Sequence, residues 1–310
     1  MLETKLPTFA LTCFFASSTV KSMGSSIYRI DSHSPEWPEL LCELPEKARP
    51  KELFVRGALP PKDALVVSIV GTRKPTTYGR DMAEDIARTL TLRGIVIASG
   101  MALGIDTVAH QTAIATRTPT LAILGNGLSE SVIYPKENLA LSREIVESGG
   151  AIISEYKDDQ KPELWTFPQR NRIIAGIAKA VVVIEAGEKS GALITARFAT
   201  EYNREVFALP GQIKSAKSQG TNALIKQGAI PITSANDILE ALGLAPETEK
   251  IERESASEEE QKILDALDEE RGLDDIIRQT QLAPHVILAA TTALELKGMI
   301  KSTSGLYRKA

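Results

Sequence analysis

With 310 residues, 43% of them hydrophobic, the chain is long enough for one large α/β domain and a small second unit. Its formal net charge of −4 excludes a general basic surface, so a nucleic-acid site has to be a local pocket built from a few cations. The two cysteines, Cys13 and Cys42, form no CxxC pair, which excludes a disulfide framework and a zinc site and favours a reducing cytoplasm.

The first sixty residues fall into two segments. Within residues 1–23, Lys5 is followed by the apolar stretch FALTCFFA, a pattern that loosely resembles a short signal peptide. The acidic Glu3 argues against that interpretation, because a signal peptide begins with a positively charged region. We expect a poorly ordered extension, with Met23 as an alternative start. In residues 24–60, five prolines predict an irregular segment with one short strand near 53–55. No run reaches the roughly 20 apolar residues of a membrane helix, so we expect no membrane partner.

Residues 61–243 show a regular alternation of short apolar runs and amphipathic segments of helical length. The apolar runs are 65–70, 95–98, 121–124, 151–154, 181–184 and 206–209. Strands that alternate with helices predict an α/β fold with a doubly wound parallel sheet. Ligands of such sheets lie beyond the carboxyl ends of the strands, so the loops after these runs, nearly all of which contain glycine, are the candidate site.

The stretch FPQRNRIIAG at 167–176 precedes one of these strands. We expect its two arginines to lie in a loop and to bind an anion, because the planar guanidinium matches phosphate oxygens. Phe167 and Trp165 offer ring faces on which bases stack. After the strand, Ser190 and Gly191 open an apolar-periodic helix whose first amides have no partners within the helix, which makes an anion site. An ordinary salt-bridged turn is the alternative for the arginines.

Residues 244–258 form an acidic run without periodicity, which predicts a linker. Residues 259–310 then predict a small winged-helix domain, with helices near 260–267, 273–280 and 284–296 and a hairpin over 299–308. The third helix has no lysine or arginine before Lys297. A protein-docking or regulatory role is therefore favoured over duplex recognition.

Two other patterns could indicate a cofactor site or a catalytic pair. The loop Gly125-Asn126-Gly127 lacks the third glycine of a dinucleotide fingerprint, since Glu130 stands there, so we expect no nicotinamide cofactor and no cofactor of another kind. Asp106 and His110 are four residues apart on one helix face, the spacing of an acid–base pair. A helix cap and a satisfied polar contact explain them equally well, so we assign no catalytic residue.

The ordered motifs of the chain resemble those of the DNA-processing protein A family, also called Smf. The motifs are SIVGTRKPTTYG at 68–79, ASGMALGIDTVAH at 98–110, YPKEN at 134–138, SEY at 154–156, FPQRNRIIAG at 167–176, EAGEKSGALITARFA at 185–199, VFALPG at 206–211 and GTNALIKQGA at 220–229. The resemblance implies an extended Rossmann-like domain that binds single-stranded DNA, forms a homodimer and loads the RecA recombinase in natural transformation, as a mediator and not an enzyme.

The resemblance also implies a set of DNA- and phosphate-binding residues. They are Gly71, Arg73, Lys136, Phe167, Arg170, Asn171, Arg172, Ser190, Gly191 and Thr195. Their expected roles are phosphate binding by the four cations, orientation by the asparagine, base stacking by the phenylalanine and anion binding at the helix start. No metal ligand is expected.

The chain departs from the family pattern in two places. The loop GNGLSESVIYP before Tyr134 is about two residues longer than usual and has Ser129 near the position of an expected aspartate, which affects where Lys136 lies. The first sixty residues are also short for the helical domain that precedes the Rossmann unit in many members.

Two alternative functions remain open. One is a nucleotide phosphoribohydrolase resembling the cytokinin-activating Log proteins, with Glu185 as its catalytic glutamate, although the loop EAGEKSGALITA lacks the consecutive glycines of that family. The other is a sensor that binds a small nucleotide in the same pocket and signals through the winged helix.

Overall fold

The computed structural model describes residues 26–244, 257–303 and 305–309. The predicted extension at 1–23 and most of the predicted linker lie outside the described residues. The chain divides into two compact units, Met1–Ala245 and Pro246–Ala310, and we describe each by itself. Across the described residues, no helix combines the length and apolarity that crossing a membrane requires.

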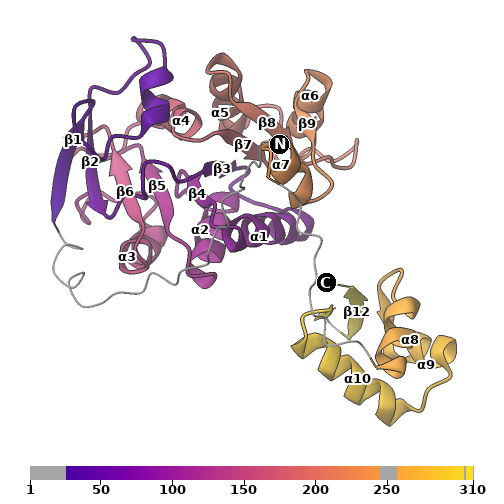
Figure 1. The fold of residues 1–310 in the computed structure, drawn as a ribbon. Coiled ribbons are helices and arrows are strands. Elements are labelled where there is room, and N and C mark those ends of the chain that lie inside the picture. Colours follow the sequence, from indigo (N-terminus) through magenta and orange to yellow (C-terminus); the bar gives the residue numbers. More distant parts are fainter. Residues whose placement is uncertain (1–25, 245–256, 304, 310) are drawn as a thin grey trace, which may run out of the picture. The chain divides into compact units, whose positions relative to one another are not determined.

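A nine-stranded sheet forms the centre of the first unit (Figure 1), in the order β1-β2-β6-β5-β4-β3-β7-β8-β9. The strands are β1 Ile27–Asp31, β2 Glu52–Gly57, β3 Val66–Val70, β4 Val96–Ser99, β5 Thr120–Leu124, β6 Ala151–Ser154, β7 Ala180–Val183, β8 Glu205–Ala208 and β9 Ile230–Pro231. The neighbouring strands β6-β5-β4-β3-β7-β8-β9 of this order are all parallel to one another. The predicted doubly wound α/β sheet is confirmed.

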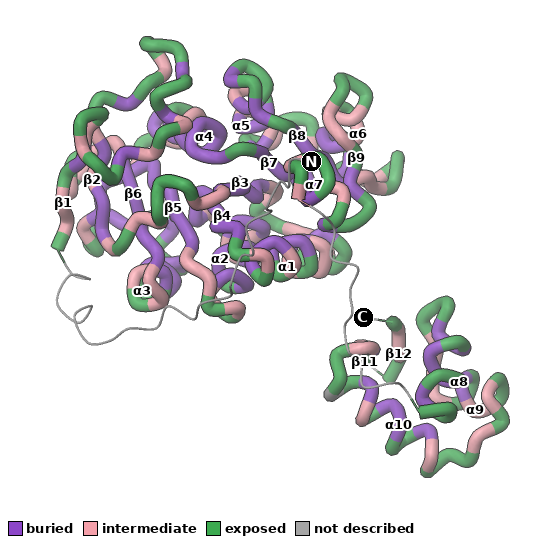
Figure 2. The backbone as a smooth tube through the Cα atoms, viewed as in Figure 1, coloured by how far each residue is buried: buried purple, intermediate pink, exposed green. Residues whose placement is uncertain are grey.

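Helices cover both faces of this sheet. The helices α1 Thr77–Leu92, α2 Ile105–Ala115, α3 Leu139–Glu147 and α7 Ala235–Ala241 pack on one face, whereas α4 Thr166–Gly176 and α5 Gly191–Glu201 pack on the other (Figure 1). Successive strand residues alternate between the two layers: Val66 and Val70 belong to one cluster of buried residues, and Val67 and Ile69 to the other. Both faces of the central strands are therefore buried, as Figure 2 shows.

The order of the strands reverses at β3. Its neighbours are β4, the next strand along the chain, and β7, which follows only after three further strands. The loops that leave β3 and β7 therefore diverge to opposite sides of the sheet and leave a crevice between them, the usual ligand position in open α/β sheets. The sequence could not predict which strands flank this crevice.

The strand predicted near 53–55 is present as β2, but the segment 24–60 holds a second strand that was not predicted. Two strands form there, β1 and β2, which pair antiparallel, and β2 continues the sheet by pairing antiparallel with β6. The 3-10 helix η2 Glu39–Glu43 lies between them. The prolines of the segment lie outside both strands, where they remove no hydrogen bond between strands. Their presence is therefore compatible with a strand before them and a strand after them.

The second unit has its own small core and a three-stranded sheet in the order β10-β12-β11. Its elements are α8 Glu258–Ala266, β10 Arg271–Gly272, α9 Leu273–Thr280, α10 Pro284–Leu296, β11 Ile300–Thr303 and β12 Leu306–Lys309. Three helices followed by a hairpin is the winged-helix arrangement that the sequence predicted. Ser257 caps α8, and Lys297 after α10 binds the Glu260 carboxylate at 2.9 Å.

Candidate functional site

The crevice between the loops after β3 and β7 holds a hollow of about 780 Å³. Its walls come from the loop after β3, the first half of α4, the loop after β7 and the first turns of α5. A smaller adjoining hollow of about 40 Å³ shares Arg73, Ala102, Phe167 and Arg170 with it. Of the ten predicted site residues, eight line the larger hollow: Gly71, Arg73, Phe167, Arg170, Asn171, Ser190, Gly191 and Thr195.

The loop after β3 presents two free cations. The backbone amide of Thr72 donates to the Glu185 carbonyl at 2.7 Å, and the Thr72 carbonyl accepts from the Ile105 amide at 3.2 Å, so the loop is tied on both sides. At Gly71, a Cβ would lie 2.7 Å from the Ile105 side chain, which explains why glycine stands there. Arg73 and Lys74 are exposed, and within the described residues neither makes an ion pair. Their charges are available to a ligand.

The start of α5 forms the opposite wall. Ser190 is the N-cap, and its hydroxyl accepts a hydrogen bond from the Ala192 amide at 3.3 Å. Gly191 is exposed, and a Cβ there would meet no atom within 4 Å, so the helix begins at an open surface. Thr195, one turn later, is buried but still lines the hollow. The predicted helix start is confirmed, and its amides and dipole favour an anion.

Phe167 separates the two hollows. Its half-buried ring lies 5.6 Å from that of Tyr134, with their planes tilted by 48°, and it lines both hollows. A Cβ on Gly125 would lie only 3.0 Å from the Phe167 ring, so a glycine is needed beneath it. Next to it, Leu164 has 92% and Trp165 52% of its surface exposed. The hollow therefore has an apolar, aromatic side facing its cationic side.

The two arginines of the RNR triplet lie within helix α4, not in a loop as predicted. Residues two apart point to opposite sides of a helix, so the helix separates Arg170 from Arg172. Arg172 does not line the hollow: it binds the Glu155 carboxylate at 2.6 Å, and its side chain is only 14% exposed. Of the two arginines expected to meet one anion, the structure brings only Arg170 to the hollow.

Arg170 is a buried framework residue more than a free phosphate ligand. Its Nη1 donates to the carbonyl oxygens of Gly100, at 2.6 Å, and of Ile123, and its Nε donates to the Asn171 side chain at 3.2 Å. Burial lowers the pKa of Arg170 to about 10, which the nearby Asp106 carboxylate opposes and the charge of Arg73 reinforces. The arginine joins the ends of β4 and β5 to α4 and places a positive charge behind the wall of the hollow.

Asn171 orients the second wall. Its Nδ2 donates to the Gly191 carbonyl at 3.2 Å, which links the middle of α4 to the start of α5. Its Oδ1 accepts the bond from Arg170. Because both side-chain groups are engaged within the protein, the asparagine positions the α5 start.

Lys136 lines neither hollow. It is exposed in the short 3-10 helix η3 Lys136–Asn138, and its predecessors Tyr134 and Pro135 line the smaller hollow. Asn138 holds this segment by donating to the Met101 carbonyl at 2.8 Å. Lys136 therefore stands next to the site but outside its wall, at the end of the loop whose length departs from the family pattern.

Sequence reasoning missed several residues of the hollow, among them three lysines and an exposed leucine: Lys74, Lys189, Lys217 and Leu164. Lys74 and Lys189 are part of motifs quoted above, GTRKP and GEKSG, and their place next to loop glycines was a usable signal. Lys217 comes from the segment after β8, which the fold brings to this edge when the Lys217 carbonyl accepts from the Ala186 amide at 2.8 Å. No local pattern marks it.

Asp106 and His110 do not form an acid–base pair. Asp106 is buried, and its Oδ2 accepts hydrogen bonds from the amides of Gly100 at 3.0 Å and Ala102 at 3.2 Å. Burial raises its pKa, and the Arg170 charge opposes that rise. His110 is fully buried with its Nδ1 2.8 Å from the Thr120 hydroxyl, and burial, helped by Arg170, lowers its pKa to about 3. Both contacts organise the fold around Arg170.

Glu185, the catalytic glutamate of the hydrolase alternative, is also engaged elsewhere. Its carboxylate accepts from the Thr76 amide at 2.9 Å and from the Thr76 hydroxyl at 2.6 Å, at the start of α1. It is 3% exposed and does not line the hollow. A Cβ on Gly79 would lie 2.4 Å from its Cδ, so α1 closes tightly over it. The geometry gives that alternative no accessible glutamate at this position.

Two protein-family models match the chain in sequence. The model described as DNA recombination-mediator protein A matches residues 29–243, and the model of the DprA winged helix domain matches residues 245–305. Together they cover both units of the structure.

Individual proteins are similar over much of the first unit. Protein Smf of Escherichia coli strain K12 is 45% identical over 193 residues, which is 62% of this chain and 51% of the relative. DNA processing protein DprA of Bacillus subtilis is 42% identical over 176 residues, 57% of this chain and 58% of the relative. The chain spans about half the length of the curated relatives it matches.

Two solved structures are similar as well. DNA processing protein A from Streptococcus pneumoniae aligns with a TM-score of 0.64 and 36% identity, over 70% of this chain and 75% of that one. The protein of the same name from Helicobacter pylori, whose structure was determined for its single-stranded DNA binding mode, aligns with a TM-score of 0.61 and 32% identity, over 70% of this chain and 95% of that one.

Proposed function

The chain belongs to the DNA recombination-mediator protein A family, and from that premise we propose that the hollow between β3 and β7 binds single-stranded DNA. The observation that carries the proposal is the combination of unlike walls in one hollow: unpaired cations and the start of α5, together with the Phe167 ring. A single strand presents both features that these walls match, charged phosphates and uncovered base faces.

The phosphates are assigned to the cationic wall. Arg73, Lys74 and Lys189 are exposed and make no ion pair within the described residues, and the first residues of α5 line the same hollow. An anion there is stabilised by hydrogen bonds as well as by charge. The charge of Arg170, buried behind the wall, also attracts the anion, while its Nη1 keeps its hydrogen bond to the Gly100 carbonyl within the protein.

A base is assigned to the apolar side. Phe167 lines both hollows, and Leu164 lies at the rim of the larger one. A duplex hides the faces of its bases in the stack, so it offers nothing to this side of the site. The proposal therefore predicts selectivity for single strands.

The finer parts of the role are proposals too. We assign the chain to the protection of incoming or processed single strands in the cytoplasm and to the loading of RecA in natural transformation and recombination, acting as a homodimer and without catalysis. The family supports this role, as does the engagement of Glu185 and His110 within the fold.

The winged helix is not assigned to duplex recognition. Helix α10 contains no lysine or arginine, and its exposed surface includes Leu288 and Glu295. Phosphate contacts supply most of the affinity for duplex DNA, so this helix lacks what major-groove docking requires.

Fluorescence anisotropy of a labelled oligonucleotide tests the proposal. We expect strand-selective binding whose log affinity falls with log salt at a slope of roughly −2, because about three phosphate contacts to single-stranded DNA contribute about −0.7 each. Equal affinity for a duplex of the same length, or no salt dependence, would contradict the site assignment. A thermal shift with mononucleotides but no oligonucleotide binding would favour the nucleotide-sensor alternative.

A further inference from the structure

A second cavity lies at the opposite edge of the sheet. It has a volume of about 230 Å³ and is bordered by the amino ends of the strands: Val66 begins β3, Leu121 belongs to the start of β5, and Lys179 directly precedes β7. The DNA site is at the carboxyl ends of β3 and β7, so this cavity and the DNA site are separated by the length of the sheet. We call it the basal cavity.

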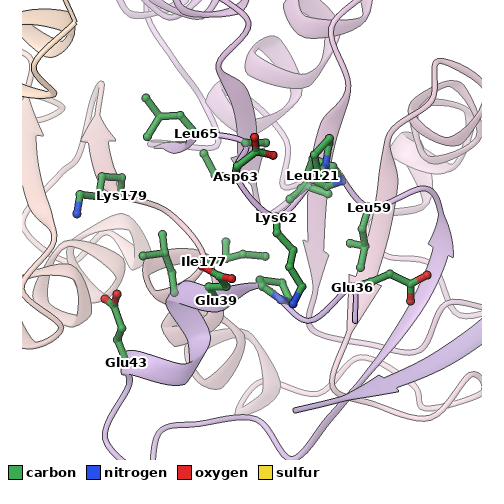
Figure 3. A pocket seen from close by; sticks show the side chains of 16 residues that line it. Glu36, Glu39, Glu43, Leu59, Lys62, Asp63, Leu65, Leu121, Ile177 and Lys179 are labelled. Atoms are coloured by element: carbon green, nitrogen blue, oxygen red, sulfur yellow. The ribbon is translucent and has the colours of Figure 1, made fainter. Parts of the chain in front are cut away.

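The basal cavity combines an apolar floor with an acidic rim. Figure 3 shows Leu59, Leu65, Leu121 and Ile177 with the carboxylates of Glu36, Glu39, Glu43 and Asp63 arranged about them. Lys62 and Lys179 are the cations of the rim. Among these acids only Glu43 forms an ion pair within the described residues, with Arg204, so Glu36, Glu39 and Asp63 remain available.

Two features hold the cavity open. Arg204, whose side chain is 4% exposed, pairs with Glu43 and donates to the Leu40 carbonyl at 2.9 Å, which fixes η2 against the first unit. Pro38, Pro60 and Pro61 stiffen the other borders, because their φ angles are locked. The cavity is therefore preformed and needs little ordering when it is filled.

The charges of the rim decide which ligand fits. Ile177, the C-cap of α4, lines the cavity, and the preceding Gly176 carbonyl accepts from Arg204 Nη2 at 3.4 Å, so the carboxyl end of the helix already has its cation within the protein. Three unpaired carboxylates against two lysines leave the rim acidic, and the floor accepts aliphatic groups. The matching ligand is a cation on an apolar stem, as an arginine has, flanked by aliphatic side chains.

We propose that the basal cavity is a docking site for a basic, aliphatic peptide segment of a partner protein, separate from the DNA site. The arginine forks of the segment meet Glu39 and Asp63, while its leucine-like side chains cover Leu59 and Ile177. Because the two sites lie at opposite edges of the sheet, the segment and a DNA strand bind at the same time.

Binding of a labelled short peptide of alternating leucine and arginine to the full chain tests this proposal. The matched probe carries glutamate in place of arginine. We expect the arginine peptide to bind and the glutamate peptide not to bind, because the unpaired rim carboxylates repel it. Glu39→Gln with Asp63→Asn should weaken the arginine peptide roughly three- to tenfold, as expected for two partly exposed ion pairs.

Control variants distinguish binding at the basal cavity from attraction to the net negative charge of the protein. Glu46→Gln removes an exposed acid that does not line the cavity and should leave peptide affinity unchanged, whereas Lys62→Ala should strengthen it. Single-stranded DNA affinity should be unaltered in all three variants, and DNA saturation should not displace the peptide. Equal loss with Glu46→Gln, equal binding of both peptides, or no binding of the arginine peptide would overturn the proposal, whatever the outcome for DNA.

Discussion

The guanidinium of Arg170 donates to the carbonyl oxygen of Gly100 at 2.6 Å, and through this bond helix α4 is fastened to the carboxyl end of β4. A Cβ on Gly100 would lie 2.6 Å from the Arg170 Nη1, so the glycine is what lets the arginine approach. The same arginine faces the buried Asp106, whose carboxylate accepts from the Gly100 amide. Arg170, Gly100 and Asp106 form one unit beneath the proposed DNA site.

Replacing Arg170 by alanine should therefore cost stability as well as DNA binding. The change leaves the buried carbonyl oxygens of Gly100 and Ile123 without the donor they share, and an unsatisfied buried polar group costs about 1–3 kcal/mol. Urea unfolding measures the loss. Arg73→Ala is the comparison, since Arg73 is exposed and should change the free energy of unfolding by less than about 0.5 kcal/mol. Equal stability of the two variants would show that Arg170 is not a framework residue.

Arg73→Ala should weaken single-strand binding without unfolding the protein. One lost phosphate contact should also reduce the magnitude of the salt slope by about 0.7. Anisotropy titrations at several salt concentrations give both quantities. Lys47→Ala removes an exposed lysine that lines neither hollow, and should change neither of them. A slope that Arg73→Ala leaves unchanged would place the phosphates elsewhere.

Phe167→Leu should separate stacking from charge. The substitution keeps an apolar side chain beside Tyr134 and removes the ring face. The free energy of binding should therefore become less favourable by about 1–3 kcal/mol, the contribution of base stacking on an aromatic side chain. The salt slope should stay as in the parent, because no phosphate contact is lost. A reduced slope with unchanged affinity at low salt would contradict the base assignment.

His110 should make the fold sensitive to mild acid. Its pKa is lowered to about 3 in the folded chain, against roughly 6.5 when unfolded. Because the unfolded state then binds the proton more readily, stability is complete above about pH 6.5 and falls as the pH decreases toward 3. The loss at pH 5 is about 2 kcal/mol from this group.

Urea unfolding at pH 5 and pH 7.5 measures that difference. His110→Asn keeps a polar group near the Thr120 hydroxyl but has no proton to take up, so its stability should vary less between the two pH values than that of the parent. If the parent and the variant lose the same free energy on acidification, His110 is not the group responsible.

Much of the fold was predictable because the spacing of apolar residues along the chain indicates which side chains will be buried. The runs that became β3 to β8 are apolar on both sides, as strands covered by two helical layers must be, and the three helices and hairpin of the winged unit follow from their own patterns. The strand β1 escaped prediction and β2 was predicted only near 53–55, since prolines around them masked their alternation and the pairing of β2 with β6 is a long-range contact.

By itself, the sequence determined the α/β class, the glycine-rich loops, the helix start at Ser190 and the family. These depend on local propensity and on the order of motifs along the chain. The tertiary structure decided what each cation does. Arg170 and Arg172 are two residues apart in sequence, yet the helix turns one toward buried carbonyls beneath the site and the other toward Glu155. Lys217 reaches the site only through chain folding, because charge partners and burial depend on contacts between distant segments.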